Sequence, residues 1–256
     1  VLTEPERFIL EELVFQVQKE MARQQELDQV AIVQRSLAPR PLVGIEGYEV
    51  GGACSPARVV GGDFYDWYLT KSGDIAFTLA DVMGKGIGAA IIAATVRGVM
   101  RSGARSASIG PTFDASAAAL DTDVDGAPGF VTVFHGRVQL ATGGVSYVDA
   151  GHGLSLVIDG ETTESVRLDS TDLPLGIQPE GLWNEQHLVL APGGTLVAVS
   201  DGVLDAFDGS LAALEEVRKI VLQSDSAQMA ADAIVCRTSE GATDDITALV
   251  IRRKHL

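Results

Sequence analysis

The sequence has few cysteines and no recognisable export signal. Its 256 residues include only Cys54 and Cys236, which lie far apart and outside any CxxC pattern. Such sparse cysteine is typical of a reducing cytosol and argues against both a disulfide framework and a zinc site. The acidic N-terminus lacks an apolar core followed by a small-residue cleavage site, so nothing resembles a secretory signal. These absences predict a cytoplasmic protein.

Long hydrophobic runs and an excess of basic charge are lacking as well. The most apolar run, residues 87–100, is too short to span a bilayer and contains Arg97. We therefore expect no membrane association. The formal net charge of −16 repels polyanions, so nucleic acid is not an expected partner. A hydrophobic content of 46% is still sufficient for one large core.

Residues 8–38 contain neither glycine nor proline and are predicted to form one long helix, which Pro39 and Pro41 end. Apolar residues at the 4-3-4 spacing of a coiled-coil seam are Leu10, Val14, Val17 and Met21. A second apolar stripe begins on a different face and comprises Leu27, Val30, Val33 and Leu37. The first stripe suits a homodimer and the second suits packing on the following domain, beside the strand from Tyr48. The alternative is a helix that lies wholly on its own domain. We divide the chain into a linker or regulatory helix, residues 1–38, and a domain of residues 39–256.

After the prolines the pattern becomes that of antiparallel strands with helices outside them. The predicted strands are 48–54, 75–80, 130–140, 145–149, 154–158, 185–190, 195–199 and 246–252. The predicted helices are 86–101, 211–222 and 226–237. This pattern implies an α+β layered domain.

Two acidic motifs, Val59-Val-Gly-Gly-Asp63 and Leu79-Ala-Asp-Val82, carry the chemistry of the sequence. Residues 68–80 between them suit a β-hairpin that turns at residues 71–74, because apolar residues alternate after the turn. Such a hairpin places Asp63 and Asp81 together at one end of a sheet. Converging carboxylates beside flexible glycines indicate a Mg²⁺ or Mn²⁺ site. Two ordinary surface turns are the simpler alternative.

Two further acidic turns come late in the sequence. Asp201 precedes Gly202 at the end of an apolar strand, and Asp244-Asp245 opens the last strand. Each turn alone is ordinary turn chemistry. Acidic residues at four strand ends of one β-rich domain favour a shared site.

The chain contains a series of motifs in a fixed order. They are Cys54-Ser-Pro-Ala-Arg-Val-Val-Gly-Gly-Asp-Phe-Tyr-Asp66, Ala80-Asp-Val-Met-Gly-Lys-Gly-Ile-Gly-Ala-Ala90, Phe130-Val-Thr132, Ala150-Gly-His152, Pro174-Leu-Gly176, Ser200-Asp-Gly-Val203 and Asp244-Asp-Ile-Thr247. In this order they resemble bacterial PPM-type serine/threonine protein phosphatases of the RsbU/SpoIIE-like group. The resemblance runs from about Gln34 to Arg252. It implies a sandwich of two antiparallel sheets flanked by helices, in agreement with the strand pattern.

The resemblance also implies the site. Asp63 and Asp81 would flank a centre of two Mn²⁺ or Mg²⁺ ions, with the Val82 carbonyl as a further ligand, and Asp201 and Asp244 would complete it. Asp245 is adjacent and could exchange roles with Asp244. Two such ions activate a water and neutralise phosphoryl charge, so no covalent nucleophile is needed.

Some positions depart from the family's larger eukaryotic branch or have a plainer interpretation. Met83 stands where that branch has a histidine proposed as general acid, and a thioether cannot give a proton. Arg58 corresponds to a phosphate-contacting arginine, although an ordinary exposed arginine is an equal alternative. Gly84-Lys85-Gly86 lacks the full phosphate-loop pattern and is interpreted as a tight entry to the helix. His152 is interpreted as a structural residue.

The resulting hypothesis is a metal-dependent protein phosphatase acting on phosphoserine or phosphothreonine. By resemblance, the substrate is a phosphorylated anti-anti-sigma factor in a partner-switching stress-response pathway. We also expect an upstream sensor domain, because such domains commonly precede this family's catalytic region and the sequence begins at Val1. The alternative is a non-catalytic metal-binding signalling module that binds its partner without turnover.

Overall fold

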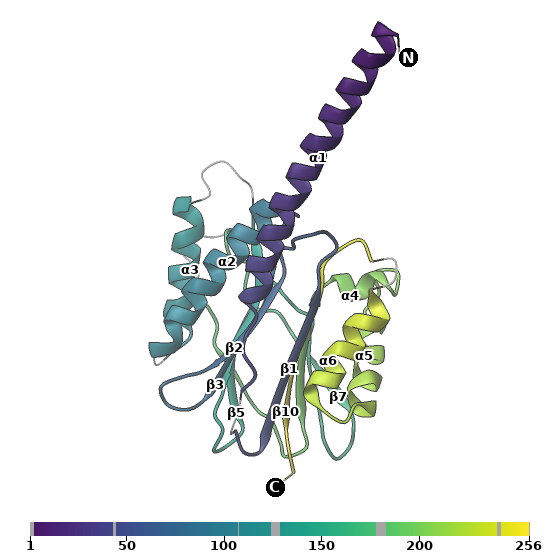
Figure 1. Ribbon diagram of the computed structural model, residues 1–256. Helices are drawn as coiled ribbons and strands as arrows, with labels where there is room; N and C mark the ends of the chain where they lie inside the picture. The colour runs from purple at the N-terminus through teal and green to yellow at the C-terminus, as the bar shows by residue number, and fades with distance from the viewer. Residues whose placement is uncertain are drawn as a thin grey trace.

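Two antiparallel β-sheets stack face to face in the computed structural model, and helices cover both outer faces (Figure 1). The structure describes residues 3–42, 45–106, 108–123, 129–177, 183–239 and 242–255. Sheet A contains, in spatial order, β1 (Tyr48–Ser55), β10 (Ile246–Arg253), β9 (Thr195–Val199), β6 (Ser155–Ile158) and β7 (Ser165–Leu168). Sheet B contains β2 (Phe64–Leu69), β3 (Ile75–Val82), β4 (Val131–Val138), β5 (Gly144–Ala150) and β8 (Gln186–Val189). The predicted α+β sandwich is confirmed.

The central strands are buried on both faces, because each lies between the other sheet and a layer of helices. In β3, Ile75, Phe77 and Leu79 face the interior between the sheets, and Ala80 and Val82 face the helices. The alternation that predicts this strand is therefore correct, but the strand is fully buried and not half-buried. Strand β7 was not predicted, since it is a short edge strand with three exposed residues and no apolar period.

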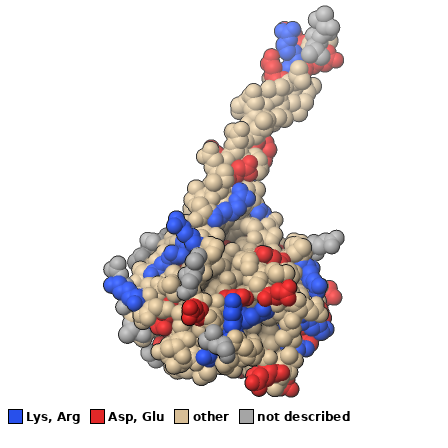
Figure 2. All heavy atoms as spheres, turned by 60° about the horizontal axis from the view of Figure 1, so that its bottom comes forward, with Lys and Arg blue, Asp and Glu red and all other residues tan. Residues whose placement is uncertain are grey.

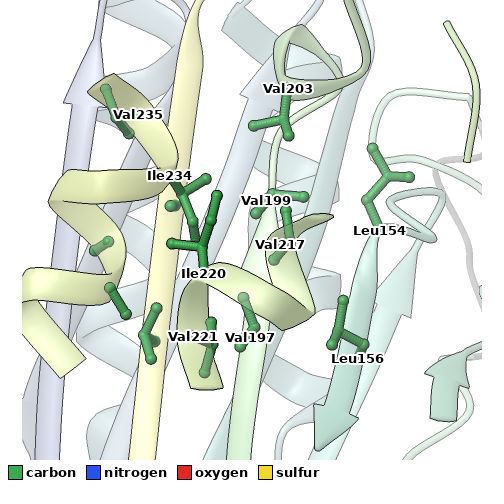
Figure 3. Packing of buried hydrophobic residues seen from close by; sticks show 14 of the residues in the cluster. Leu154, Leu156, Val197, Val199, Val203, Val217, Ile220, Val221, Ile234 and Val235 are labelled. Atoms are coloured by element: carbon green, nitrogen blue, oxygen red, sulfur yellow. The ribbon is translucent and has the colours of Figure 1, made fainter. Parts of the chain in front are cut away.

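Helices α2 (Ile87–Ser102) and α3 (Gly110–Asp123), joined through the 3₁₀ turn η1 (Gly103–Arg105), cover sheet B. Helices α5 (Ala212–Gln223) and α6 (Ala227–Thr238), with the short α4 (Gly202–Asp205), cover sheet A. Figure 3 shows Val217 and Ile220 of α5 and Ile234 of α6 packed toward Val197 and Val199 of β9. The three predicted helices correspond to α2, α5 and α6. Helix α3 was not predicted, because its small side chains give only a weak apolar stripe.

Helix α1 (Glu4–Ser36) projects from the sandwich and touches it only near its C-terminal end (Figure 1). It begins four residues earlier than predicted, because Thr3 and Glu6 form a capping box and Pro5 is tolerated in the first turn. It ends at Ser36, two residues before the predicted end. No helix in the described part of the chain is long and apolar enough to cross a membrane.

The packing of α1 confirms the second predicted stripe in part, at Val30, and rules out the alternative of a helix lying wholly on its domain. Val30 and Ala31 pack on Val59 and Val60 and on Ala90 of α2, and not beside the strand from Tyr48. Val33 points away and is 60% exposed. The other large apolar side chains of α1, apart from the half-buried Leu27, are exposed: Phe8, Ile9, Leu10, Leu13, Val14, Phe15, Val17, Met21 and Ile32. Figure 2 shows that this face of the projecting helix is mostly uncharged, with acidic side chains at intervals along it.

Candidate metal centre

The β2–β3 hairpin brings Asp63 and Asp81 together. Phe64 pairs with Ala80 in the antiparallel register. Asp63, which precedes Phe64, and Asp81, which follows Ala80, are therefore the next two residues beyond this pair at the same end of the hairpin. The turn lies where the sequence predicts it, with Thr70 N donating to Asp74 O at 2.8 Å. The hairpin is longer than predicted, because its first strand, β2, begins at Phe64 and not at Tyr68.

The second pair of acidic turns comes from the neighbouring strands β9 and β10. Their register pairs Val199 with Ala248, and Ser200 N donates to Thr247 O at 2.9 Å. A Cβ on Gly202 would lie 2.2 Å from the backbone oxygen of Asp245, so only glycine allows these two turns to pack this closely. Asp201 and Asp244 therefore lie at the same end of the sandwich as Asp81.

The electrostatics of the carboxylates show that they influence one another. Burial raises the pKa of Asp63 well above its ordinary value, and the charge of Asp81 raises it further. Burial and then the charge of Asp201 raise the pKa of Asp81 to about 6. The pKa of Asp201 is raised by burial and by Asp244. Oδ2 of Asp63 is buried without a hydrogen-bond partner. A cluster of this kind is unfavourable unless protons or cations compensate its charge.

The donor atoms fit a hard divalent cation, although they do not form a closed coordination shell. Carboxylate and carbonyl oxygens are the ligands that Mg²⁺ and Mn²⁺ prefer, and Asp63 Oδ2 is a buried oxygen without a partner. The Val82 carbonyl oxygen borders the Asp63 loop, since a Cβ on Gly62 would lie 2.7 Å from it. Among the described residues, no three side chains of the ligating types are close enough to hold one ion. The carboxylates are therefore neighbours that would have to turn toward a shared ion.

Asp244 and Asp245, which the sequence could not distinguish, have different surroundings. Asp245 is 5% exposed and accepts hydrogen bonds at Oδ1 from Ala57 N (2.8 Å) and at Oδ2 from Gly62 N (2.6 Å). It also accepts a longer bond from Asp63 N at 3.3 Å. The side chain of Asp244 is 42% exposed and faces Lys85. Asp245 is thus engaged by three backbone groups, whereas Asp244 accepts one backbone hydrogen bond, from Asp245 N at 2.9 Å, and its Oδ2 is ion-paired with Lys85.

Lys85 is a member of the site that sequence reasoning missed. Its Nζ lies 3.0 Å from Asp244 Oδ2 and donates to Thr243 O at 2.5 Å. Gly84 and Gly86 on either side have positive φ angles, and α2 begins directly afterwards, as the predicted tight helix entry requires. The available signal was a lysine four residues after Asp81, in the same tight turn.

Arg58, Met83 and His152 are placed as follows. Arg58 and Asp63 line one cleft of about 490 Å³ between α1, α2 and the start of β2. Met83 is anchored through its backbone, which donates to Phe130 O at 2.9 Å, and its thioether offers no proton. His152 is buried, its backbone N donates to Asp149 Oδ1 at 2.8 Å, and burial lowers its pKa. It is a structural residue, as expected.

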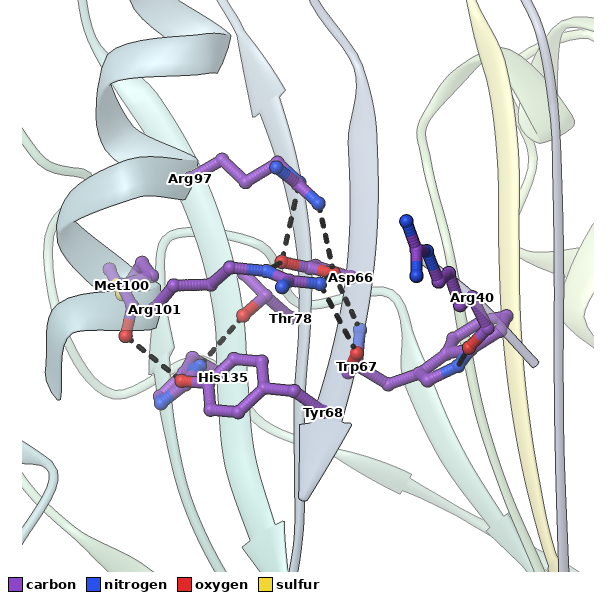
Figure 4. Close-up of polar contacts among 9 residues, drawn as sticks. All are labelled: Arg40, Asp66, Trp67, Tyr68, Thr78, Arg97, Met100, Arg101 and His135. Carbon is purple, nitrogen blue, oxygen red and sulfur yellow. Dashed lines mark hydrogen bonds and ion pairs between the residues drawn. The ribbon is translucent and has the colours of Figure 1, made fainter. Parts of the chain in front are cut away.

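A buried ion-pair cluster that the sequence did not predict links β2 to α2 (Figure 4). Arg101 donates from Nη2 to Asp66 Oδ1 at 2.7 Å and from Nε to Oδ2 at 2.5 Å. Arg97, one turn earlier, has its Nε 3.3 Å from Asp66 Oδ2. Since α2 follows the turn that carries Asp81 and Lys85, this cluster fixes the helix behind the carboxylates.

Comparison with known proteins identifies the family and the fold. The family model for Stage II sporulation protein E (SpoIIE) matches residues 71–254. Protein IcfG of Synechocystis sp. is 27% identical over 221 residues, covering 76% of this chain and 35% of IcfG. Phosphoserine phosphatase RsbU of Bacillus subtilis is 25% identical over 240 residues, covering 90% of this chain and 70% of RsbU. The solved SiaA-PP2C domain of Pseudomonas aeruginosa superimposes with a TM-score of 0.74 at 21% identity, covering 92% and 98% of the two chains.

The fold is therefore that of a PP2C-type phosphatase domain. The family model covers well over half of the sequence, so the chain belongs to the SpoIIE family, and the resemblance to the RsbU/SpoIIE-like group is confirmed. The chain spans only about a third of the length of IcfG, since the match covers 35% of that protein.

Proposed function

We propose that this chain is a metal-dependent protein-serine/threonine phosphatase acting on a phosphorylated regulatory protein. The observation that supports this most directly is the cluster of Asp63, Asp81, Asp201 and Asp244 at one end of a SpoIIE-family sandwich. The proposed cofactors are two Mn²⁺ or Mg²⁺ ions. When bound, such a pair supplies an activated water and neutralises charge on the phosphoryl oxygens.

Each residue has a distinct task in this proposal. Asp63 and Asp81 would hold the ions from the β2–β3 hairpin, with the Val82 carbonyl beside them. Asp201 and Asp244 would complete the ligand set from the ends of β9 and β10. For Asp244 Oδ2 to serve as a ligand, its ion pair with Lys85 would have to open. Met83 gives no proton, so protonation of the leaving serine or threonine oxygen would have to come from water or from another group, or be unnecessary.

The cleft beside Asp63 suits a phosphorylated segment of a protein substrate. Arg35, Arg58 and Arg97 line it together with the carboxylates of Asp28 and Asp63, and Arg97 is ion-paired with Asp66. With cations bound at Asp63, Arg35 and Arg58 would supply the positive charge that favours an anionic ligand at that place. We assign Arg58 to the substrate phosphate, because it shares the cleft with Asp63. By family resemblance, the substrate is a phosphorylated anti-anti-sigma-type protein in a partner-switching stress-response pathway.

Control of the activity is assigned to the N-terminal helix. Residues 1–38 form the regulatory segment in this proposal, and residues 39–256 form the phosphatase domain. The apolar stripe of Leu10, Val14, Val17 and Met21 is exposed and has the spacing of a coiled-coil seam. A second copy of this chain is its proposed partner, and an upstream sensor domain would act on the pair.

Phosphate release from a serine-phosphorylated anti-anti-sigma protein tests the function. We expect turnover with Mn²⁺ and none in excess EDTA. Arg58→Met should raise KM, whereas Arg23→Met on the exposed part of α1 should leave KM unchanged. Binding of Mn²⁺ and of the phosphoprotein without phosphate release would instead establish the alternative, a non-catalytic signalling module.

A further inference from the structure

A second cleft, next to the one that contains Asp63, is lined by arginine side chains. It has a volume of about 510 Å³ and is formed by residues 36–42, β2 and α2. Among the described residues, no aspartate or glutamate lines it, and its cationic lining residues are Arg40, Arg97 and Arg101. We call it the arginine cleft. The cleft beside Asp63, by contrast, contains carboxylates as well as arginines. A lining of only positive charge is unexpected in a chain with a net charge of −16.

The carboxylate that pairs with these arginines does not neutralise all of them. Asp66 is buried behind the cleft and pairs with both Arg97 and Arg101 (Figure 4). The guanidinium group of Arg40 has no hydrogen-bond or ion-pair partner in the described part of the chain. Three guanidinium groups facing one carboxylate leave two positive charges at the cleft. Uncompensated charge of one sign favours a ligand of the opposite sign.

Two of the arginines retain hydrogen-bond donors. Arg101 holds Asp66 through Nε and Nη2, whereas its Nη1 has no partner among the described residues. The Arg101 side chain is 40% exposed, so this donor can reach a ligand. Arg40 is exposed too, and its backbone is held in place because Trp67 Nε1 donates to Arg40 O at 2.9 Å. The planar donor set of a guanidinium group matches the oxygens of a phosphate group.

The arginine cleft also has an apolar wall. Leu37, Pro41 and Leu69 line it, and Leu69 is 46% exposed at the end of β2. Inorganic phosphate would use only the arginines, whereas the organic group of a phosphate ester would also cover these apolar side chains. Since covering apolar surface is favourable, the lining as a whole suits an ester better than free phosphate.

We propose that the arginine cleft binds a small phosphate monoester. Its phosphate group contacts Arg40 and Arg101, and its organic group lies against Leu37 and Leu69. Arg97, which lines both clefts, adds positive charge between them. None of the four aspartates assigned to the metal centre lines the arginine cleft. The site is therefore separate from that centre, and the proposal does not depend on the proposed function.

Titration of the metal-free protein with phenyl phosphate, followed by tryptophan fluorescence, tests the proposal. Trp67 lines the cleft and is one of two tryptophans in the sequence. A chelating resin removes divalent ions beforehand, so that no phosphate binds through a metal. We expect half-saturation at about 1 mM phenyl phosphate and at about tenfold higher orthophosphate, because only the ester covers apolar surface. Phenol, which lacks the phosphate group, should give no saturation.

Arginine substitutions locate the ligand. Arg40→Met removes a charge that has no partner in the folded protein, so it should weaken binding about fivefold and leave the melting temperature unchanged. Arg101→Lys keeps a positive charge opposite Asp66 but loses the planar donor set, and should weaken binding about threefold. The controls are Arg58→Met, in the cleft beside Asp63, and Arg23→Met, on the exposed part of α1. Both change the net charge as Arg40→Met does and should bind like the wild type.

Several results would overturn the proposal. Wild-type affinity in both Arg40→Met and Arg101→Lys would exclude the arginine cleft, as would the lack of saturation by phenyl phosphate up to about 20 mM. A loss of binding in Arg58→Met alone would place the ligand beside Asp63. Equal affinities for phenyl phosphate and orthophosphate would show that the apolar wall takes no part. Because these measurements involve neither metal nor turnover, they are independent of whether the chain is a phosphatase.

Discussion

The Lys85 ammonium group lies 3.0 Å from Oδ2 of Asp244, a carboxylate that we assign to the metal centre. The lysine therefore compensates part of the negative charge of the cluster, and a cation at Asp244 has to displace it. The pair is about one-third exposed on the lysine side and more so on the aspartate side, so its contribution is that of a partly screened ion pair.

Replacing Lys85 with methionine should strengthen metal binding. The substitution removes a competitor for Asp244 and a like charge beside the ions, so we expect the Mn²⁺ half-saturation concentration to fall about two- to fivefold. The metal-free protein should unfold at a lower temperature, since the carboxylates lose a neighbouring cation. Lys71→Met, in the exposed hairpin turn, is the control. A Lys85→Met protein that needs more Mn²⁺ than the wild type would show that the lysine supports binding and does not compete with it.

Asp81→Asn should alter the pH dependence of stability in EDTA. The folded-state pKa of Asp81 is about 6, above its ordinary 3.8, so the native state binds this proton more tightly than the unfolded state does. Its contribution to the free energy of unfolding is greatest below pH 4 and is lost as the pH rises from about 4 to about 6, on the order of 3 kcal/mol. Asparagine cannot titrate, so the variant should lack this decline.

Thermal scans between pH 4.5 and 7.5 check this prediction. At pH 7 without metal, we expect Asp81→Asn to melt above the wild type. With saturating Mn²⁺ the order should reverse, because only the wild type gains from the bound ions. Parallel pH profiles of the melting temperature for the two proteins in EDTA would show that the pKa of Asp81 is not raised in the folded state.

The buried cluster around Asp66 predicts a large loss of stability. The Asp66 side chain is 2% exposed and accepts hydrogen bonds from Arg101 and from Arg97. Asp66→Asn leaves the Arg97 and Arg101 guanidinium groups without their counter-charge, and because Arg101 is 40% exposed we expect the free energy of unfolding to fall by only about 2 kcal/mol. Glu216→Gln, which breaks an exposed pair with Lys219, should cost at most about 0.5 kcal/mol. Equal losses in urea denaturation would mean that the cluster contributes no more than a surface pair.

The exposed half of α1 predicts self-association. Val14→Asp/Val17→Asp places charge on the seam and should give a monomer, whereas Gln16→Asp/Lys19→Asp, on the opposite face, should not. A chain that starts at Leu27 keeps the turns that contact the domain, including Gln34, and should also be monomeric. Light scattering checks all four proteins. If the unmodified chain is a monomer at micromolar concentration, the seam has another partner.

The hairpin could be predicted from sequence because its determinants are local. Alternation in residues 75–79 and a turn-forming tetrapeptide set the register, and the register places Asp63 beside Asp81. The motif order likewise made the fold class predictable. Helix α3 could not be predicted in this way, because its apolar residues form no clear stripe in the sequence. Only the structure shows that Phe113, Ala117 and Leu120 pack against sheet B.

The different surroundings of Asp244 and Asp245 could not be predicted, because they depend on contacts with residues far away in the sequence. The Asp245 carboxylate accepts hydrogen bonds from Ala57 N and Gly62 N, which lie more than 180 residues away in the sequence. No local pattern indicates which of the two adjacent carboxylates faces the loop that contains these residues. The same applies to Gln34. In the sequence it is one polar residue of the predicted helix, and only the structure shows that its side chain donates to Gly61 O.

The most direct test of the account is phosphate release by Asp201→Asn, measured with Mn²⁺ on a serine-phosphorylated protein substrate. An amide cannot supply the charge of a carboxylate ligand, so we expect turnover to fall at least about 100-fold while the far-ultraviolet circular dichroism spectrum stays unchanged. Asp208→Asn, at an exposed turn position that tolerates asparagine, should retain wild-type turnover. Turnover near the wild-type rate in Asp201→Asn would contradict the proposed metal centre.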